Sequence, residues 1–261
     1  NSVEHIGFKA FDDCVKLTEI TIPESVNSIG AQAFCYCISL SSFKGKFATE
    51  DGLCLIVDGT LNAIAIGRDN IGDYVIPSSV NIIEMYSIYY CHSMTSVTIP
   101  DSVSVIRDGA FKSCTSLKEV YCKPTTPPTG GYDMFYDNAL GRKIYVPAES
   151  YYDYISAEGW KDYAEYIVAY DFEKGEVVEV EKPEPGNPDE IENNQIWYTS
   201  YGGEVYINRP EAFNAAIVSN ICYGDYGVIT FDEELTTIGD FAFAGANNLC
   251  TLTLPGSVVS V

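Results

Sequence analysis

Apolar residues recur in one fixed order along this chain, in a unit of 23 residues. Residues 17–39 read LTEITIPESVNSIGAQAFCYCIS, and residues 94–116 read MTSVTIPDSVSVIRDGAFKSCTS. In both copies the first, fourth and sixth positions are apolar, a proline follows them, and a phenylalanine lies in the second half. A period of roughly 20–29 residues headed by L-x-x-L-x-L is typical of a leucine-rich solenoid. One such repeat buries too little to fold alone, so the array is the expected folding unit.

The first half of each unit predicts a short strand. In Ile20-Thr21-Ile22 apolar and polar residues alternate, which places the apolar side chains on one side of a strand and the polar ones on the other. The residues between the apolar ones should form an outward strand ladder, which we take as the candidate binding face: Glu19, Thr21, Ser42, Lys44, Asp73, Val75, Ser96, Thr98, Glu119 and Tyr121. The simpler alternative is that Ser and Thr are favoured in any exposed strand.

The second half, I-G-x-x-A-F-x-x-C, places apolar residues at steps of three and four, which predicts a short helical turn packed over the strand. Gly30 and Gly239 share one position there with Glu84 and Arg107, so that position should not require a positive φ. A serine recurs two residues after the repeat proline, and we expect each to bond the backbone in a turn: Ser25, Ser79, Ser102, Ser150 and Ser257.

Residues 40–70 interrupt the period and are expected to form a β-hairpin insert. Two apolar runs flank Asp58-Gly59, and Asp-Gly between β-rich runs is a strong hairpin signal. Phe43 and Phe47 should anchor the insert to the array. Such an insert either carries a binding function or is a passive decoration.

The array should end in a helical C-terminal cap at residues 117–170, which closes a first domain of residues 1–170. KIYVP at 143–147 is expected as the last strand. Tyr163, Tyr166, Ile167 and Tyr170 are spaced as one face of a helix. Residues 171–195, acidic and proline-containing, should be an extended linker.

Residues 196–261 should hold the N-terminal cap and first repeats of a second leucine-rich array. A hairpin across Gly202-Gly203 and a helical turn at residues 211–213 are expected in the cap. A repeat unit follows the cap, and these residues occupy its repeat positions: Ile229, Phe231, Ile238, Gly239 and Phe243.

Both ends of the sequence fall within a repeat, so we expect an excised piece whose targeting signals lie elsewhere. Residues 2–6 and 257–261 are the same part of the unit, which suggests head-to-tail self-association through open repeat ends.

The pattern L-x-x-I-x-I-P-x-S-V-x-x-I-G-x-x-A-F-x-x-C resembles the BspA-like leucine-rich repeats, which are found in surface proteins of gut and oral anaerobes and of some mucosal parasites. The resemblance covers nearly the whole chain. It implies a leucine-rich solenoid at the cell surface or secreted, with binding or adhesion as its role and no catalytic residues or cofactor.

The net charge of −22 argues against nucleic acid and anionic membranes as partners, because phosphate recognition needs clustered Lys and Arg. It fits either a self-repelling soluble surface or an acidic patch for a cationic partner. No apolar run reaches 18 residues, so no transmembrane segment is expected in this sequence.

Candidate chemistry is sparse. Cys14, Cys37, Cys91 and Cys114 all lie three residues after the phenylalanine position, where Ala246 stands in another copy. This indicates buried free thiols that act as small apolar side chains. Cys91-His92 are adjacent, which is a poor geometry for a nucleophile and its base, and Cys35-x-Cys37 lacks the second pair of a zinc site. We therefore predict no catalytic, cofactor or metal residues, with adventitious calcium on the acidic surface as the alternative.

Three functions remain at this stage. The leading one is a non-enzymatic, surface-displayed solenoid that binds a protein ligand, such as a host extracellular-matrix protein or another surface protein. The second is a glycan-binding module, motivated by the 20 tyrosines. The third is a stalk that spaces other domains, motivated by the linker.

Overall fold

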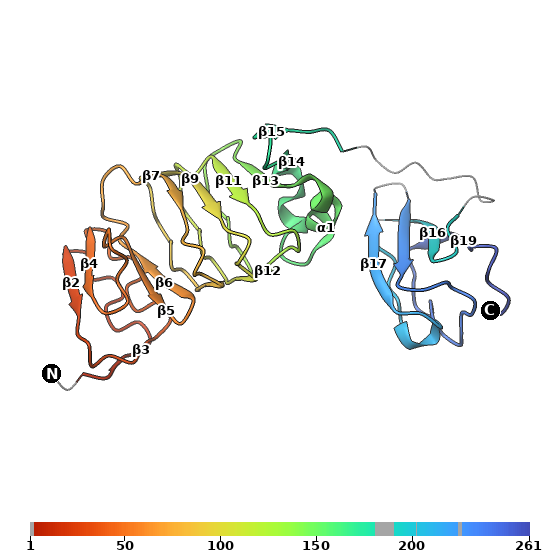
Figure 1. Cartoon of the computed structure of the whole chain (residues 1–261), viewed down its shortest axis with the longest axis horizontal. Coiled ribbons are helices and arrows are strands. Elements are labelled where there is room, and N and C mark those ends of the chain that lie inside the picture. The colour runs from red at the N-terminus through yellow and green to blue at the C-terminus, as the bar shows by residue number, and fades with distance from the viewer. Residues whose placement is uncertain (1–2, 181–190, 202, 224–225) are drawn as a thin grey trace. The chain divides into compact units, whose positions relative to one another are not determined.

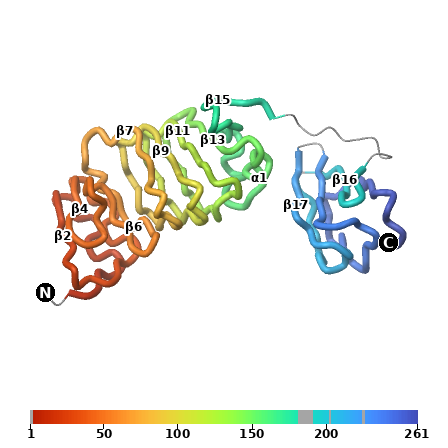
Figure 2. The backbone as a smooth tube through the Cα atoms, viewed as in Figure 1, coloured from red at the N-terminus to blue at the C-terminus, as the bar shows by residue number. Residues whose placement is uncertain are grey.

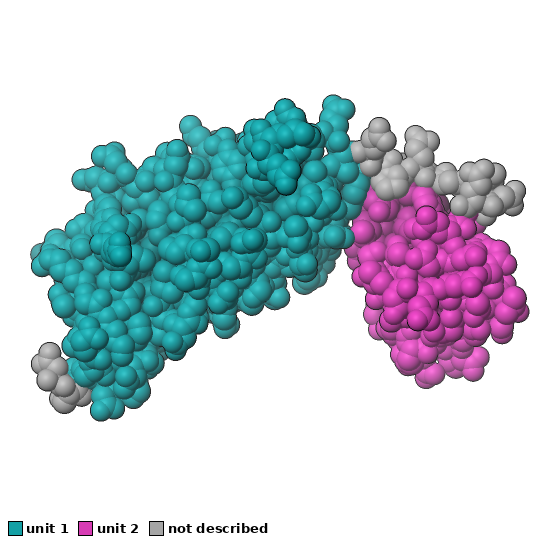
Figure 3. Space-filling view, in the orientation of Figure 1, with its two compact units in different colours: residues 1–180 teal, residues 181–261 magenta. Residues whose placement is uncertain are grey.

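The computed structural model describes residues 3–180, 191–201, 203–223 and 226–261. The chain divides into two compact units, residues 1–180 and 181–261 (Figure 3). Of the expected linker at 171–195, residues 181–190 lie outside the described residues. None of the helices in the described ranges has the length and apolar composition that crossing a bilayer requires.

Unit 1 is a β-solenoid whose successive coils lie side by side (Figure 2). The predicted repeat strands are confirmed, and five of them form one parallel ladder (Figure 1): β7 (Gly72–Val75), β9 (Met94–Ile99), β11 (Glu119–Cys122), β13 (Lys143–Pro147) and β14 (Ile167–Asp171). A short strand, β15 (Glu176–Val177), adds to β14 in the antiparallel direction. The first two repeat strands, β2 (Glu19–Ile22) and β4 (Ser42–Gly45), form a separate parallel pair.

The helical turn expected in the second half of each repeat is not confirmed as a helix. A second set of strands, each two residues long, begins there: β1 (His5–Ile6), β3 (Ser28–Ile29), β8 (Ile82–Ile83), β10 (Val105–Ile106) and β12 (Thr129–Gly130). The residues after them form turns that hydrogen-bond to the next coil, as Phe111 N does to Met134 O at 2.9 Å. Every second N–H of such a turn bonds the next coil in this way, and those between them bond locally, as Ala110 N does to Arg107 O, so no regular helix forms.

Two residues of each such turn adopt left-handed backbone conformations, and most of them are not glycine. Tyr86 and Tyr90 in one coil have φ of 53° and 65°, and Asp133 and Asp137 in another both have φ of 57°. The glycine position itself is different: Gly30 and Gly239 do not have positive φ, as the sequence predicts.

Four serines after the repeat proline, Ser25, Ser102, Ser150 and Ser257, bond the backbone as expected, but across coils instead of within a local turn. Ser25 Oγ donates to Val3 O and Ser102 Oγ to Val80 O, both at 2.7 Å. Each bond spans 22 residues, so the serine links one repeat to the repeat before it.

A single core runs through unit 1 and includes the repeat positions of every coil. Rings at the phenylalanine position stack from coil to coil, with centroids 5.2 Å apart for Phe11–Phe34 and also 5.2 Å apart for Phe111–Phe135. Such stacked pairs add to the stabilisation that burial alone provides.

The insert forms the predicted hairpin, β5 (Cys54–Val57) and β6 (Thr60–Ile64). Asp58 and Gly59 have φ of 47° and 75°, the positive values that a type I′ turn requires. Phe43 anchors the region as expected, since it is buried against Phe34 with ring centroids 5.3 Å apart. Strand β6 also pairs in parallel with β8, so the hairpin joins the sheet of short strands.

The cap of unit 1 holds three short helices: η1 (Ala148–Ser150), α1 (Tyr151–Ser156) and η2 (Lys161–Tyr166). The predicted helix face is wrong beyond Tyr166, because Ile167 and Tyr170 lie in β14. Hence β13 is not the last strand. The exposed edge of β13 gives Ile167–Asp171 a pairing partner, and the alternating burial of Ile167 and Ala169 fits a strand.

Unit 2 has its own core and a four-stranded sheet in the order β17 (Ile217–Cys222), β18 (Gly227–Phe231), β16 (Gln195–Ser200) and β19 (Leu249–Thr253). A short helix, η4 (Pro210–Ala212), forms near the expected turn. Ile229, Phe231 and Ile238 are buried, as their repeat positions predict.

The expected hairpin after β16 does not form in the described part. Gly202 lies outside the described residues, and residues 204–207 form no strand. Instead β16 pairs antiparallel with both β18 and β19, and so separates two repeat strands that a regular array would pair directly.

Candidate functional site

The outward strand ladder forms two surfaces instead of one. Glu19 and Thr21 of β2 lie beside Ser42 and Lys44 of β4, but β4 has no strand contact with β7 among the described residues. The hairpin insert enters the chain between β4 and β7 and interrupts the ladder. We call the residues that point outward from β7, β9, β11, β13 and β14 the strand face.

On the strand face the remaining six predicted residues are brought together in two rows. Asp73, Ser96 and Glu119 are in register in one row, and Val75, Thr98 and Tyr121 in the next. The ten predicted residues range from exposed to partly buried, except Ser96, which is 9% exposed.

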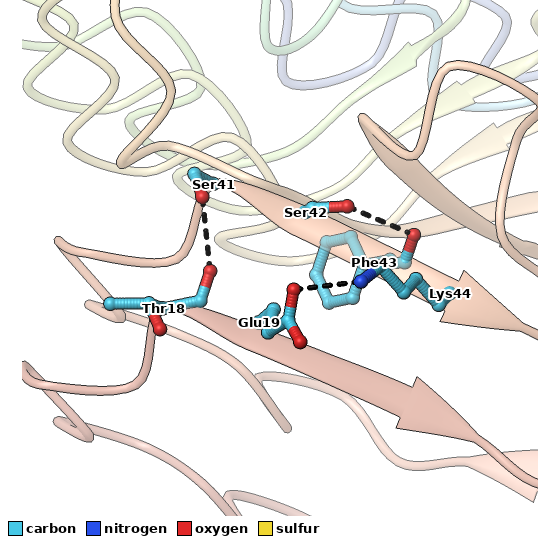
Figure 4. A network of polar contacts seen from close by, with 6 residues as sticks. All are labelled: Thr18, Glu19, Ser41, Ser42, Phe43 and Lys44. Carbon is cyan, nitrogen blue, oxygen red and sulfur yellow. Dashed lines mark hydrogen bonds and ion pairs between the residues drawn. The ribbon is translucent and has the colours of Figure 1, made fainter.

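The first surface is held by an ion pair between neighbouring coils (Figure 4). Lys44 Nζ lies 2.8 Å from Glu19 Oε2, and Ser41 Oγ donates to Thr18 O at 3.1 Å beside it. Both charged side chains are more than half exposed, so solvent weakens the attraction between them. The pair neutralises the lysine and leaves this small surface without net charge.

Asp73 organises the first row of the strand face. Its Oδ1 accepts hydrogen bonds from Ser96 Oγ at 2.8 Å and from Thr95 Oγ1 at 3.1 Å. These bonds explain why Ser96 is buried although its side chain points outward. They also use polar groups that a ligand would otherwise contact.

Tyrosines dominate the end of the strand face nearest the cap. The rings of Tyr121 and Tyr145 stack with centroids 4.7 Å apart and planes 17° apart, and Tyr170 packs 5.1 Å from Tyr145. We call these three residues the tyrosine row. Phe172 extends it, with its ring centroid 5.0 Å from that of Tyr170. All three tyrosines remain partly exposed.

Glu119 ties the tyrosine row together. Its carboxylate accepts hydrogen bonds from the Tyr121 hydroxyl at 3.2 Å and from the Tyr145 hydroxyl at 3.5 Å. Burial and the nearby negative charge of Glu119 raise the pKa of Tyr121 to about 12, and the same causes raise the pKa of Tyr145. Both hydroxyls therefore stay protonated at neutral pH and can donate.

A cavity of 660 Å³ lies beside the tyrosine row at the carboxyl ends of the strands. Tyr170 and Phe172 line it, together with Lys123, Glu149 and Asp171. Its volume is within the range of roughly 300–1,000 Å³ that is usual for ligand sites. The cavity and the row make one continuous region, because Tyr170 belongs to both.

Sequence reasoning missed Tyr145, Tyr170 and Phe172. Tyr145 follows Tyr121 by 24 residues and is in register with it, so the repeat period could have found it. We predict Tyr170 on a helix face from its spacing, whereas the short apolar run of Ile167, Val168, Ala169 and Tyr170, with two β-branched residues, was the available signal for a strand.

Cys91 and His92 lie in different environments. Cys91 is buried, and burial raises the pKa of its thiol to about 11, whereas His92 is exposed and bonds Thr115 Oγ1 through Nδ1 at 2.8 Å. Within the part of the chain that the structure describes, no three His, Cys, Asp or Glu side chains are placed to hold a metal ion.

Comparison with known proteins points to one family of repeats. The family model described as BspA type leucine rich repeat region matches six copies, over residues 1–49, 67–156 and 220–261. Among curated proteins, none matches this chain.

Solved structures with similarity to the chain include three bacterial proteins. A leucine rich cell surface protein from Faecalibacterium prausnitzii A2-165 is 24% identical with a TM-score of 0.44, over 57% of this chain and 46% of that one. A leucine-rich repeat protein from Eubacterium ventriosum ATCC 27560 is 16% identical with a TM-score of 0.39, over 59% and 51%. The pneumococcal vaccine antigen PcpA is 15% identical with a TM-score of 0.36, over 65% and 58%. The chain thus spans about half the length of the first two, 46% and 51%.

Proposed function

The chain belongs to the BspA-type leucine-rich repeat family, and from this membership we propose that its strand face binds a protein partner at a cell surface. Members of this family are typically surface proteins, and their repeats are non-enzymatic scaffolds. We therefore assign a binding role to the exposed face of the solenoid, and adhesion is the consequence of that binding.

The observation that carries the proposal is the tyrosine row. Partly exposed tyrosines are enriched where proteins meet, because each offers a large apolar ring and a polar hydroxyl at little cost in side-chain entropy. Tyr121, Tyr145 and Tyr170 come from three adjacent strands, so the β-sheet holds their rings in place before a partner arrives. Such preorganisation lowers the entropic cost of binding.

The same geometry favours a protein over a glycan at this face. A sugar binds an aromatic residue by lying flat on its ring, but Tyr121 and Tyr145 each cover one ring face of the other. The row presents ring edges and hydroxyl groups beside its remaining ring faces, and this mixture suits the mixed apolar and polar contacts of a protein interface.

A stalk that only spaces other domains is the remaining alternative. It gives no reason for three aromatic side chains to stay partly exposed on adjacent strands. A stalk predicts no binding at this face, which the binding screen tests.

The test has two steps. The chain is first screened against extracellular-matrix proteins and other surface proteins, and a hit is measured by surface plasmon resonance. Tyr121→Ser and Tyr145→Ser should then weaken affinity about tenfold or more, as expected for central aromatic residues. Tyr121→Phe keeps the stacking and removes the bond to Glu119, so it should weaken affinity less.

Matched controls separate binding from folding. Tyr132→Ser changes a tyrosine that is 77% exposed on a turn, away from the strand face, and should leave affinity unchanged. Lys44→Glu alters the separate β2–β4 surface and should matter only for a partner long enough to reach it. The proposal would be contradicted if no protein in the screen bound the chain, or if Tyr121→Ser and Tyr145→Ser left the affinity unchanged.

A further inference from the structure

A second cavity, of 380 Å³, lies away from the strand face, where the insert rejoins the array. Six residues define its chemistry: Ile66, Arg68, Asp69, Tyr90, His92 and Ser93. The first three belong to the end of the insert, and the last three to the turn region of the following repeat. The cavity exists only because the insert brings these two segments together.

The insert side of the cavity is fixed in position. Gly67 N donates to Leu40 O at 2.8 Å, and a Cβ added at Gly67 would lie 2.3 Å from the backbone of Ser39. Only glycine permits this close approach, so the backbone on either side of Gly67 is held against the preceding coil.

Arg68 is held by two backbone carbonyls. Its Nε donates to Ser41 O at 3.0 Å, and its Nη2 donates to Asp51 O at 2.7 Å. A guanidinium carries five N–H groups, so Arg68 keeps donors beyond these two. Ser93 Oγ donates to Arg68 O at 2.9 Å and closes the junction with the next repeat.

The repeat side contributes two aromatic residues in fixed orientation. The rings of Tyr90 and His92 meet edge to face with centroids 4.0 Å apart, and the ring centroid of Tyr36 lies 4.9 Å from that of Tyr90. His92 Nδ1 bonds Thr115 Oγ1 at 2.8 Å, which leaves Nε2 as the ring nitrogen able to meet a ligand.

The charges of the cavity balance. It holds one carboxylate, Asp69, and one guanidinium, Arg68, beside an imidazole. An ionised ligand would gain from one charge and be repelled by the other, whereas a neutral ligand with many hydroxyl groups can bond both. Aromatic residues add a surface for the C–H groups of such a ligand.

We propose that this cavity between the insert and the Tyr90–His92 turn binds a single neutral hexose unit of a glycan. The C–H groups of the sugar contact the part of the Tyr90 ring that lines the cavity, its hydroxyl groups donate to the Asp69 carboxylate, and Arg68 donates to hydroxyl oxygens. The insert then has a function of its own, independent of the strand face. A chain with both sites holds a protein partner and a glycan at separate places.

The test uses the intact chain on an array of neutral glycans that end in glucose, galactose, mannose or N-acetylglucosamine, with sialylated and sulfated glycans on the same array. We expect binding to at least one neutral glycan, measured again in solution by calorimetry with the free oligosaccharide. Asp69→Asn and Tyr90→Ala should each weaken it about tenfold or more, because a charge-assisted hydrogen bond or an aromatic contact is lost.

Matched variants on other turns of unit 1 serve as controls. Asp137→Asn and Tyr136→Ala change an exposed aspartate and an exposed tyrosine two repeats away and should leave glycan affinity unchanged. Asp69 is exposed, so Asp69→Asn tests the site even if Tyr90→Ala fails to fold. The proposal is overturned if no neutral glycan binds, if only charged glycans bind, or if Asp69→Asn leaves the glycan affinity unchanged. Tyr121→Ser should leave glycan binding intact, which keeps this test separate from that of the strand face.

Discussion

The Sγ atom of Cys114 donates a hydrogen bond of 3.0 Å to the backbone carbonyl oxygen of Ile88, one repeat earlier. Cys37 makes the equivalent bond to Phe11 O at 3.1 Å. The cysteine position therefore does more than fill space. It satisfies a carbonyl group that the stacking of coils removes from water.

In the last coil the same task falls to an amide. Asn138 Nδ2 donates to Phe111 O at 2.8 Å, and Phe111 is the next residue in the column that holds Ile88. Two different side chains thus make one contact at successive turns of the solenoid. A thiol and an amide can each provide this donor.

We predict that Cys114→Ala lowers the free energy of unfolding by about 1–3 kcal/mol, because it leaves the buried Ile88 carbonyl without its donor. Cys114→Ser should cost less than Cys114→Ala, since a hydroxyl of similar reach can donate to the same oxygen. Denaturant melts of the two variants measure the difference. As a control, Cys250→Ala changes an exposed cysteine and should stay within about 0.5 kcal/mol. Equal losses for the Ala and Ser variants would contradict the bond.

Thiol accessibility should follow burial. Burial raises the pKa of both Cys37 and Cys91 to about 11 from 9.0, and burial also raises the pKa of Cys114 well above 9.0. The thiolate is the reactive form, so all three should resist labelling at pH 8 in the native state and react once unfolded. Cys250, which is exposed, should label at once.

Cys14 corrects the expectation that the whole column is inaccessible. It is only partly buried, because within the described residues a coil packs on one side of it alone. Mass spectrometry after a short pulse of iodoacetamide should find Cys14 labelled ahead of Cys37. Rapid labelling of Cys114 in the native protein, or its recovery in a disulfide-linked peptide, would refute the assignment.

The insert depends on its turn. Gly59 has φ of 75°, and a Cβ there would lie 2.6 Å from Asn81 Oδ1. We expect Gly59→Ala to lower the free energy of unfolding by about 1–2 kcal/mol, the cost of a left-handed conformation with a side chain. Gly7→Ala is the matched control, because a Cβ at Gly7 meets no atom within 4 Å. Similar melting curves for both variants would show that the turn does not constrain the hairpin.

Self-association through a repeat edge is the last prediction. Within the described residues β2 pairs only with β4, so its other edge carries unpaired backbone groups that tend to find partners. The carbonyls of Thr18 and Ile22 bond the coil of β4, so Thr21, at the alternate position, directs its N–H to the open edge.

Light scattering across concentration should show growing mass for the chain, and Thr21→Pro, which removes that N–H, should reduce it. Glu19→Pro is a second test at the same edge. This prediction would be contradicted if the chain stayed a monomer at all concentrations, or if both variants left the oligomer unchanged. Residue 2, at the start of the complementary segment 2–6, lies outside the described residues.

The sequence by itself determined the local features. Val97 and Val120 alternate with polar neighbours, so their burial and the direction of Thr98 follow from the twofold period of a strand. Asp58-Gly59 likewise specifies its turn, because few residue pairs accept positive φ at both positions. These features depend on a few adjacent residues, and a single repeat contains all the information.

Tertiary structure decided which segments pair. Ile167 and Tyr170 fit a helix face or a strand equally well by spacing, and the open edge of β13 selected the strand. The second half of each repeat became a two-residue strand and a turn because every second N–H of the turn bonds the next coil. The position of strand β16 between β18 and β19 is likewise not predicted by any local pattern in the sequence.

The candidate sites divide in the same way. The period of 23 residues places Thr98 and Tyr121 in one outward row, but the stacking of Tyr145 and Tyr170 on them depends on how the cap strand docks. The cavity beside Arg68 joins residues from the insert and from the following repeat, which are 20 or more residues apart in sequence. Backbone hydrogen bonds and glycine contacts over that distance bring them together, and these are properties of the stacked coils instead of the repeat motif.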